Sequence, residues 1–123
     1  MNTTLENASP IEKLFDLDMI NKFCRGDINL TKKMIQVFIK DIPISVEEIK
    51  QAYRESDFIK MKKTAHRIKP VLSMYSIVKV GKEIEVLEMI DQEDIQTAET
   101  ELKINKLDNI INLVTQQMTT YIS

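Results

Sequence analysis

The chain has 123 residues, which suits a single domain, and its net charge is only −2. With 43% hydrophobic and 29% charged residues, the composition excludes an intrinsically disordered chain, and the small negative charge gives no electrostatic basis for nucleic-acid binding. The single cysteine excludes an intrachain disulfide and no apolar run reaches the length of a membrane span, so we expect a cytoplasmic protein without membrane association.

The N-terminal part of the sequence predicts a leader followed by a short helix. Residues 1–10 are polar, and we expect a flexible leader before a single domain at residues 11–123. Within "SPIEKLF", Ser9 and Pro10 are typical of a helix start, which predicts a helical turn. The segment "DLDMINKFC" predicts a short helix that ends at Gly26.

Two longer helices are predicted in the middle of the chain. The segment "NLTKKMIQVFIKDIPISVEEIKQAY" has apolar residues at helical spacing, and Pro43 either bends one helix or separates two. Asp57, together with the preceding serine, is a plausible cap for a helix from Phe58 to about Tyr75. A break is expected near Ser76.

The last part of the chain predicts two more helices. The segment "VKVGKEIEVLEMI" is expected to be helical, "DQED" a turn, and the final helix is expected to run from about Ile95. Its apolar residues step by three and four, which is typical of a bundle seam: Ile104, Leu107, Ile111, Val114, Met118 and Tyr121. The sequence therefore predicts an all-α fold, an antiparallel four-helix bundle with an additional short N-terminal helix.

His66, the only histidine, lies in the helix predicted from Phe58. At about 100° per residue, the core stripe of this helix falls nearly opposite His66 and consists of Met61, Ala65, Ile68, Leu72 and Tyr75. The residues within about 60° of His66 are Lys62, Lys63, Lys69, Pro70 and Ser73. Ile59 and Ile77 share this solvent face and are expected to be partly exposed.

A run of five cations without an acid surrounds the histidine: Lys60, Lys62, Lys63, Arg67 and Lys69. Because like charges on one helix repel, such a cluster suggests an anionic partner. It also disfavours imidazolium, so we expect a neutral ring with one free nitrogen, which suits attack on a phosphoryl group. An ordinary surface histidine is the alternative. A metal site and a serine–histidine triad are poorly supported by these residues.

These residues resemble the histidine-containing phosphotransfer (HPt) domain of bacterial multistep phosphorelays. That family centres on A-H-x-[LI]-K-G, which this sequence matches at Ala65, His66, Ile68 and Lys69. Pro70 replaces the usual glycine, and Ser76 stands at a later position that is usually small. The resemblance extends from Phe15 to the end of the chain, through the short helix, the G-D turn and the helix layout.

The resemblance implies a phosphocarrier rather than an enzyme, since no nucleotide-binding or kinase motif is present. His66 would accept a phosphoryl group from a receiver-domain aspartyl phosphate and pass it to another receiver, and Lys69 would contact that group. Glu88 stands where many members have a glutamine that holds the imidazole, and a surface glutamate at a helix end is the alternative. The implied partners are response-regulator receiver domains and a hybrid sensor histidine kinase. The chain would need no cofactor or metal, because Mg²⁺ belongs to the receiver, and it would act as a monomer.

Further residues are supporting candidates. Lys63 and Arg67 are expected to steer an acidic receiver pocket toward the site. An apolar docking rim is expected at Met19, Ile20, Phe23, Ile59 and Ile77, with core packing as the alternative for each of them.

Pro70 removes a backbone N–H, which predicts a kinked helix that continues beyond it. The rival function is a helical-bundle adaptor that binds signalling partners without phosphotransfer.

Overall fold

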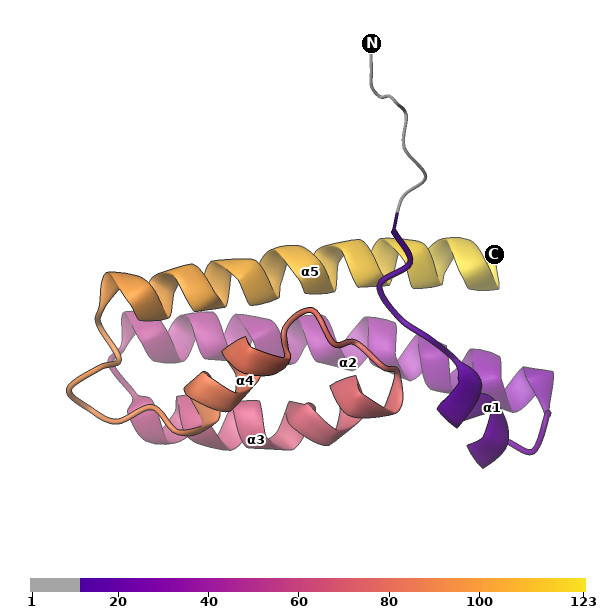
Figure 1. Ribbon diagram of the computed structural model, residues 1–123, viewed down its shortest axis with the longest axis horizontal. Helices are drawn as coiled ribbons and strands as arrows, with labels where there is room; N and C mark the ends of the chain where they lie inside the picture. Colours follow the sequence, from indigo (N-terminus) through magenta and orange to yellow (C-terminus); the bar gives the residue numbers. More distant parts are fainter. Residues whose placement is uncertain (1–11) are drawn as a thin grey trace, which may run out of the picture.

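The computed structural model describes residues 12–123, and the described part is an all-helical bundle without strands (Figure 1). The expected all-α fold is therefore confirmed. The helices are α1 (Asp18–Phe23), α2 (Ile28–Arg54), α3 (Phe58–Met74), α4 (Gly81–Glu88) and α5 (Ala98–Ile122). The expected leader and the helix start at Ser9 and Pro10 lie outside the described residues.

Helices α2 to α5 form a ring in which each contacts the next along the chain. Helix α2 packs on α3, α3 on α4 and α4 on α5, and α5 packs back on α2. Figure 1 shows α2, α3 and α5 along the long axis, with the shorter α4 between α3 and α5 and α1 beside the first turns of α2. Successive helices of the ring run in alternating directions (Figure 1). The contact between α3 and α4 places these two helices side by side.

The core is built from apolar side chains of all four ring helices. Ile49, Met61, Leu87 and Leu107, one from each helix, are fully buried. The core stripe predicted for α3 is confirmed, because its five members are at most 3% exposed. Burying such a stripe stabilises the fold by roughly 1.5–3 kcal/mol for each large apolar side chain. It also fixes which face of α3 is left for solvent.

The seam predicted for α5 is confirmed except at its last member. Met118 is fully buried, whereas Tyr121 is 48% exposed, so its place in the seam is wrong. The seam continues instead to Ile122, which packs partly buried against the core. The reason is the helical period: a step of four from Met118 stays on the buried stripe, whereas a step of three leaves it near the helix end.

Three helices end in the same left-handed turn. The residues after the caps of α1, α2 and α3 have positive φ angles: Arg25 (54°), Ser56 (53°) and Ser76 (54°). After α3, the N–H of Ile77 bonds to the carbonyl of Leu72 at 2.9 Å, which is the six-to-one bond of a Schellman motif. The break predicted near Ser76 is confirmed, and this turn sends the chain back toward α4.

The two internal prolines do not end their helices. Helix α2 is continuous through Pro43, so of the two alternatives at this proline the structure has the single helix. Helix α3 continues through Pro70 to Met74, as predicted. Since proline has no N–H, the carbonyl of His66 has no helical partner at position 70. His66 lies on the solvent face of α3, and we expect water to hydrate this carbonyl.

The segment before α1 differs from the prediction. Residues 12–17 contain no helical turn, and hydrogen bonds to other elements hold them instead. The Gln117 side chain accepts from Leu14 N at 2.9 Å and donates to the Glu12 carbonyl, and Asp16 N donates to the Tyr75 carbonyl at 2.9 Å. These long-range bonds satisfy the backbone without helix formation.

The start of α5 also differs by a few residues. The helix begins at Ala98 because Thr97 caps it, accepting a hydrogen bond from Thr100 N at 3.2 Å. Ile95, the expected first residue, is buried in the preceding turn. None of the helices within residues 12–123 has the length and apolar character needed to cross a membrane.

Candidate functional site

His66 presents its ring on the solvent face of α3, with a side chain that is 79% exposed. Its Nδ1 atom is hydrogen-bonded to Oε2 of Glu88, the last residue of α4. A carboxylate only accepts hydrogen bonds, so Nδ1 carries the proton of this bond. In a neutral imidazole the other nitrogen, Nε2, then has a free lone pair that faces away from the carboxylate.

Lys69 binds the other oxygen of the same carboxylate. Its Nζ lies 3.1 Å from Oε1 of Glu88. The side chain of Glu88 is 20% exposed and that of Lys69 is 42% exposed. Because Lys69 follows His66 by three residues, both project from one face of α3. One carboxylate from α4 therefore holds the imidazole and the ammonium group together.

The hydrogen bond from His66, and next the one from Lys69, lower the pKa of Glu88 below its ordinary value. A carboxylate that accepts charge-assisted hydrogen bonds is stabilised in its ionised form. Glu88 is therefore a carboxylate near neutral pH, as its role of acceptor to both partners requires.

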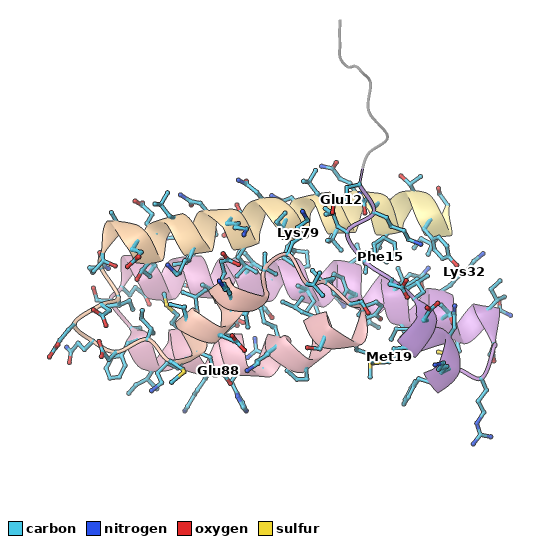
Figure 2. All side chains as sticks on the ribbon, viewed as in Figure 1. Glu12, Phe15, Met19, Lys32, Lys79 and Glu88 are labelled. Carbon is cyan, nitrogen blue, oxygen red and sulfur yellow. The ribbon has the colours of Figure 1, made fainter. Side chains whose placement is uncertain are left out.

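The site opens onto a shallow depression of about 510 Å³. Its lining is Met19, His66, Lys69, Pro70, Ser73, Met74 and Glu88. Pro70 and Ser73 thus lie where the helical wheel placed them. Figure 2 labels two of the lining residues, Met19 on α1 and Glu88 on α4. Met74 was not predicted as a site residue, because a position eight residues after His66 lies about 80° from it on the helical wheel.

The expected docking rim is only partly exposed. Met19 (53%), Phe23 (63%) and Ile59 (53%) are accessible. Ile20 and Ile77 are 0% and 3% exposed, so the expectation that they contribute to a docking surface is wrong. Ile20 is on the face of α1 that packs into the core. Ile77 follows the left-handed turn at the end of α3, so the helical wheel does not apply to it.

Acidic residues of other helices lie closer to the basic run than the sequence indicated. The guanidinium of Arg67 binds Glu48 Oε1 at 2.6 Å and Ser45 Oγ at 3.1 Å, both on α2. Arg67 is thus a contact between α3 and α2, and we do not propose it further as a steering residue. Lys62 and Lys63 are exposed and form no ion pair within residues 12–123.

The ion pairs between helices were not predictable from the sequence alone. Arg67 and Lys69 each meet a carboxylate from a neighbouring helix, Glu48 and Glu88 respectively. Within residues 12–123, the site is therefore a nearly balanced group of charges, and Lys62 and Lys63 stand beside it without an ion pair. Such a group can hold a neutral nucleophilic nitrogen and receive an anionic group.

Comparison with models of protein families, with curated proteins and with solved structures gives no match.

Proposed function

We propose that this protein is a phosphocarrier of the HPt type, in which Nε2 of His66 accepts a phosphoryl group. The observation that carries the proposal is the bond between Nδ1 of the exposed His66 and the Glu88 carboxylate. This bond keeps the proton on Nδ1 and leaves Nε2 as a nucleophile. The motif around His66 and the bundle architecture support the same reading.

The phosphoryl donor in this proposal is an aspartyl phosphate on a receiver domain. The Nε2 lone pair attacks phosphorus, the N–P bond forms, and the P–O bond to the aspartyl carboxylate breaks. The aspartate leaves with the bonding electrons. The ring keeps its proton on Nδ1 and becomes a phosphorylated imidazolium, whose positive charge the Glu88 carboxylate stabilises. Transfer to a second receiver is the reverse of these steps.

Neighbouring residues support the proposal. Lys69 is one turn from His66 and stabilises the phosphoryl oxygens, which carry about two negative charges. Lys62 and Lys63 are exposed and raise the rate at which an acidic receiver pocket associates. Met19, Phe23 and Ile59 supply exposed apolar area for docking.

The wider assignment follows from the resemblance. We expect the phosphoryl group to originate from a hybrid sensor histidine kinase and the carrier to work as a monomer in the cytoplasm. The chain is a carrier, not an enzyme. Mg²⁺ would be bound by the receiver domain.

Phosphotransfer with two His66 variants tests the proposal. Receiver domains that carry radiolabelled aspartyl phosphate are mixed with the wild type or with His66→Gln. We expect label on the wild type that is stable in base and labile in acid, as phosphohistidine is, and none on the variant. Equal labelling of both proteins would overturn the proposal. Binding of a receiver without any transfer of label would favour the adaptor function instead.

Arg67→Gln is a matched control for this experiment. It changes a charged residue next to His66 whose partners, Glu48 and Ser45, lie on α2 away from the imidazole. We expect its labelling to stay close to that of the wild type.

A further inference from the structure

Lys69 is needed in two places. In the structure its ammonium group lies on the Glu88 carboxylate, with Nζ 3.1 Å from Oε1. In the proposed function the same ammonium group stabilises the phosphoryl oxygens on His66. The unphosphorylated site thus differs from the phosphorylated one in the partner of Lys69.

The charges favour a change of partner. At rest Lys69 balances the negative charge of Glu88. A phosphoryl group adds about two negative charges and three acceptor oxygens, which attract an ammonium group more strongly than one partly exposed carboxylate oxygen. The phosphorylated imidazolium, still bound to Glu88 through Nδ1, then balances the carboxylate. Each negative group keeps a positive partner when Lys69 moves.

The geometry allows the change without loss of the imidazole bond. Lys69 uses Oε1 of Glu88, whereas His66 uses Oε2, so Lys69 can leave while the His66 bond stays. The Lys69 side chain is 42% exposed and has a flexible four-carbon stem, so it is free to rotate toward Nε2. Arg67 of α3 is the other nearby cation with a carboxylate partner, and it is bound to Glu48 and Ser45 of α2.

We propose that Glu88 anchors Lys69 in the resting protein, and that phosphorylation of His66 transfers Lys69 from Glu88 to the phosphoryl group. This inference rests on the proposed phosphocarrier function and adds a regulatory consequence. Breaking the resting ion pair opposes phosphorylation, and re-forming it favours release. The resting ion pair between Lys69 and Glu88 thereby offsets part of the stabilisation that Lys69 gives to phosphorylated His66, and it favours onward transfer.

A double-mutant cycle measures this coupling. The four proteins are the wild type, Lys69→Met, Glu88→Gln and the double variant. Glutamine keeps an acceptor oxygen for Nδ1–H of His66 while it removes the charge that anchors Lys69. The equilibrium constant for phosphoryl exchange with one receiver domain is measured for each protein from the radiolabel on both partners.

We expect Lys69→Met to reduce the phosphorylated fraction in both backgrounds, and more strongly in Glu88→Gln. The difference should be roughly two- to fivefold, which is the equilibrium equivalent of one exposed ion pair. In the wild type the loss of Lys69 also removes the resting pair, which offsets part of the effect. Lys62→Met is the matched control, because Lys62 has no ion pair within residues 12–123, and it should show no coupling to Glu88→Gln.

The outcomes separate this inference from the function on which it rests. Label on wild-type His66, with equal effects of Lys69→Met in both backgrounds, overturns the transfer of Lys69 and leaves the phosphocarrier function intact. It would mean that Lys69 contacts carboxylate and phosphoryl together. Absence of label on the wild type overturns the phosphocarrier function, and this inference with it.

The resting anchor is tested without phosphorylation. Nuclear magnetic resonance of the Glu88 carboxyl carbon gives its titration in the wild type and in each lysine variant. Lys69→Met should raise the pKa of Glu88, and Lys62→Met should not. An unchanged titration in Lys69→Met would overturn the anchor. Circular dichroism of each variant confirms that the helices are retained.

Discussion

Glu83 and Glu88 lie near opposite ends of α4, and in each of them one carboxylate oxygen binds a lysine of a neighbouring helix. Glu83 binds Lys106 of α5 at 3.2 Å, and Glu88 binds Lys69 of α3 at 3.1 Å. Their side chains are similarly covered, with 14% and 20% exposed. The second oxygen distinguishes them. In Glu88 it binds the exposed ring of His66, whereas in Glu83 it is buried without a hydrogen-bond partner among the described residues.

The difference separates a structural carboxylate from one that, in the proposed function, positions a nucleophile. A carboxylate and a lysine on neighbouring helices form an ordinary contact between those helices. A carboxylate that also holds an exposed imidazole determines which ring nitrogen is free to react. Helix α4 thus has one end that contributes to the bundle and one end that organises the site. Substitutions at each end of α4 can test that division.

The largest expected effect is on the core that holds both ends of α4 in place. Leu87 is fully buried one residue before Glu88. Leu87→Ala removes buried methyl groups and leaves a cavity, so it should lower the free energy of unfolding by about 2–5 kcal/mol. Urea denaturation measures this change. Val86→Ala is the control, because Val86 is 40% exposed and should lose less than about 1 kcal/mol. Equal losses in the two variants would contradict the assigned packing.

The next effect compares the two carboxylates directly. Glu88→Ala frees the His66 ring to rotate and to change tautomer, so the rate of phosphotransfer should fall by roughly 10- to 100-fold. Glu83→Ala should leave that rate unchanged within about twofold, because Glu83 does not contact the histidine. Rapid-quench kinetics with a phosphorylated receiver provides the measurement. An unchanged rate in Glu88→Ala would remove the positioning role of this residue.

A smaller effect is expected at the structural end of α4. Lys106→Met removes the lysine that binds Glu83 and leaves a largely buried carboxylate without its partner. The free energy of unfolding should fall by about 1 kcal/mol. Lys82→Met, an exposed change beside Glu83 on α4, should have almost no effect when both variants are compared by urea denaturation. The rate of phosphotransfer should be the same in both variants. A loss of transfer in Lys106→Met would contradict a purely structural role of this end of α4.

The smallest effect is the pH dependence of stability near Glu88. Its pKa in the folded protein is below the ordinary value of 4.5, because His66 and Lys69 bind the ionised form. The stabilising contribution is therefore complete above about pH 4.5 and is lost as pH falls through the lowered pKa. Urea denaturation of the wild type and Glu88→Gln should show a gap in stability that closes in acid. A gap that stays constant down to pH 2 would contradict the bonding of Glu88.

Much of the fold is predictable from local sequence patterns. The apolar stripe of α3 follows the helical period, so the exposure of His66, Pro70 and Ser73 was correctly predicted. The cap at Asp57 was also predictable, because its side chain accepts from Lys60 N three residues later. Two of the errors occur where the helical period ends. Ile77 lies beyond the left-handed turn, and Tyr121 is on the last turn of its helix.

The site was less predictable than the fold, because the sequence does not show which residues of different helices contact each other. The sequence shows a cluster of like charges around His66, but it does not show that Glu48 on α2 binds Arg67. Glu88 was considered through the family resemblance, whereas its bond to Lys69 follows only from the packing of α4 on α3. Long-range pairings of this kind depend on the angle and register of two helices, which one sequence does not specify.

The central claim is that Glu88 holds the proton on Nδ1 of His66 and leaves Nε2 to carry the phosphoryl group. Nuclear magnetic resonance of the phosphorylated protein, with isotope-labelled histidine nitrogens, tests this claim most directly. We expect phosphorus bonded to Nε2 and a proton retained on Nδ1. A phosphoryl group on Nδ1, or on any residue other than His66, would contradict it.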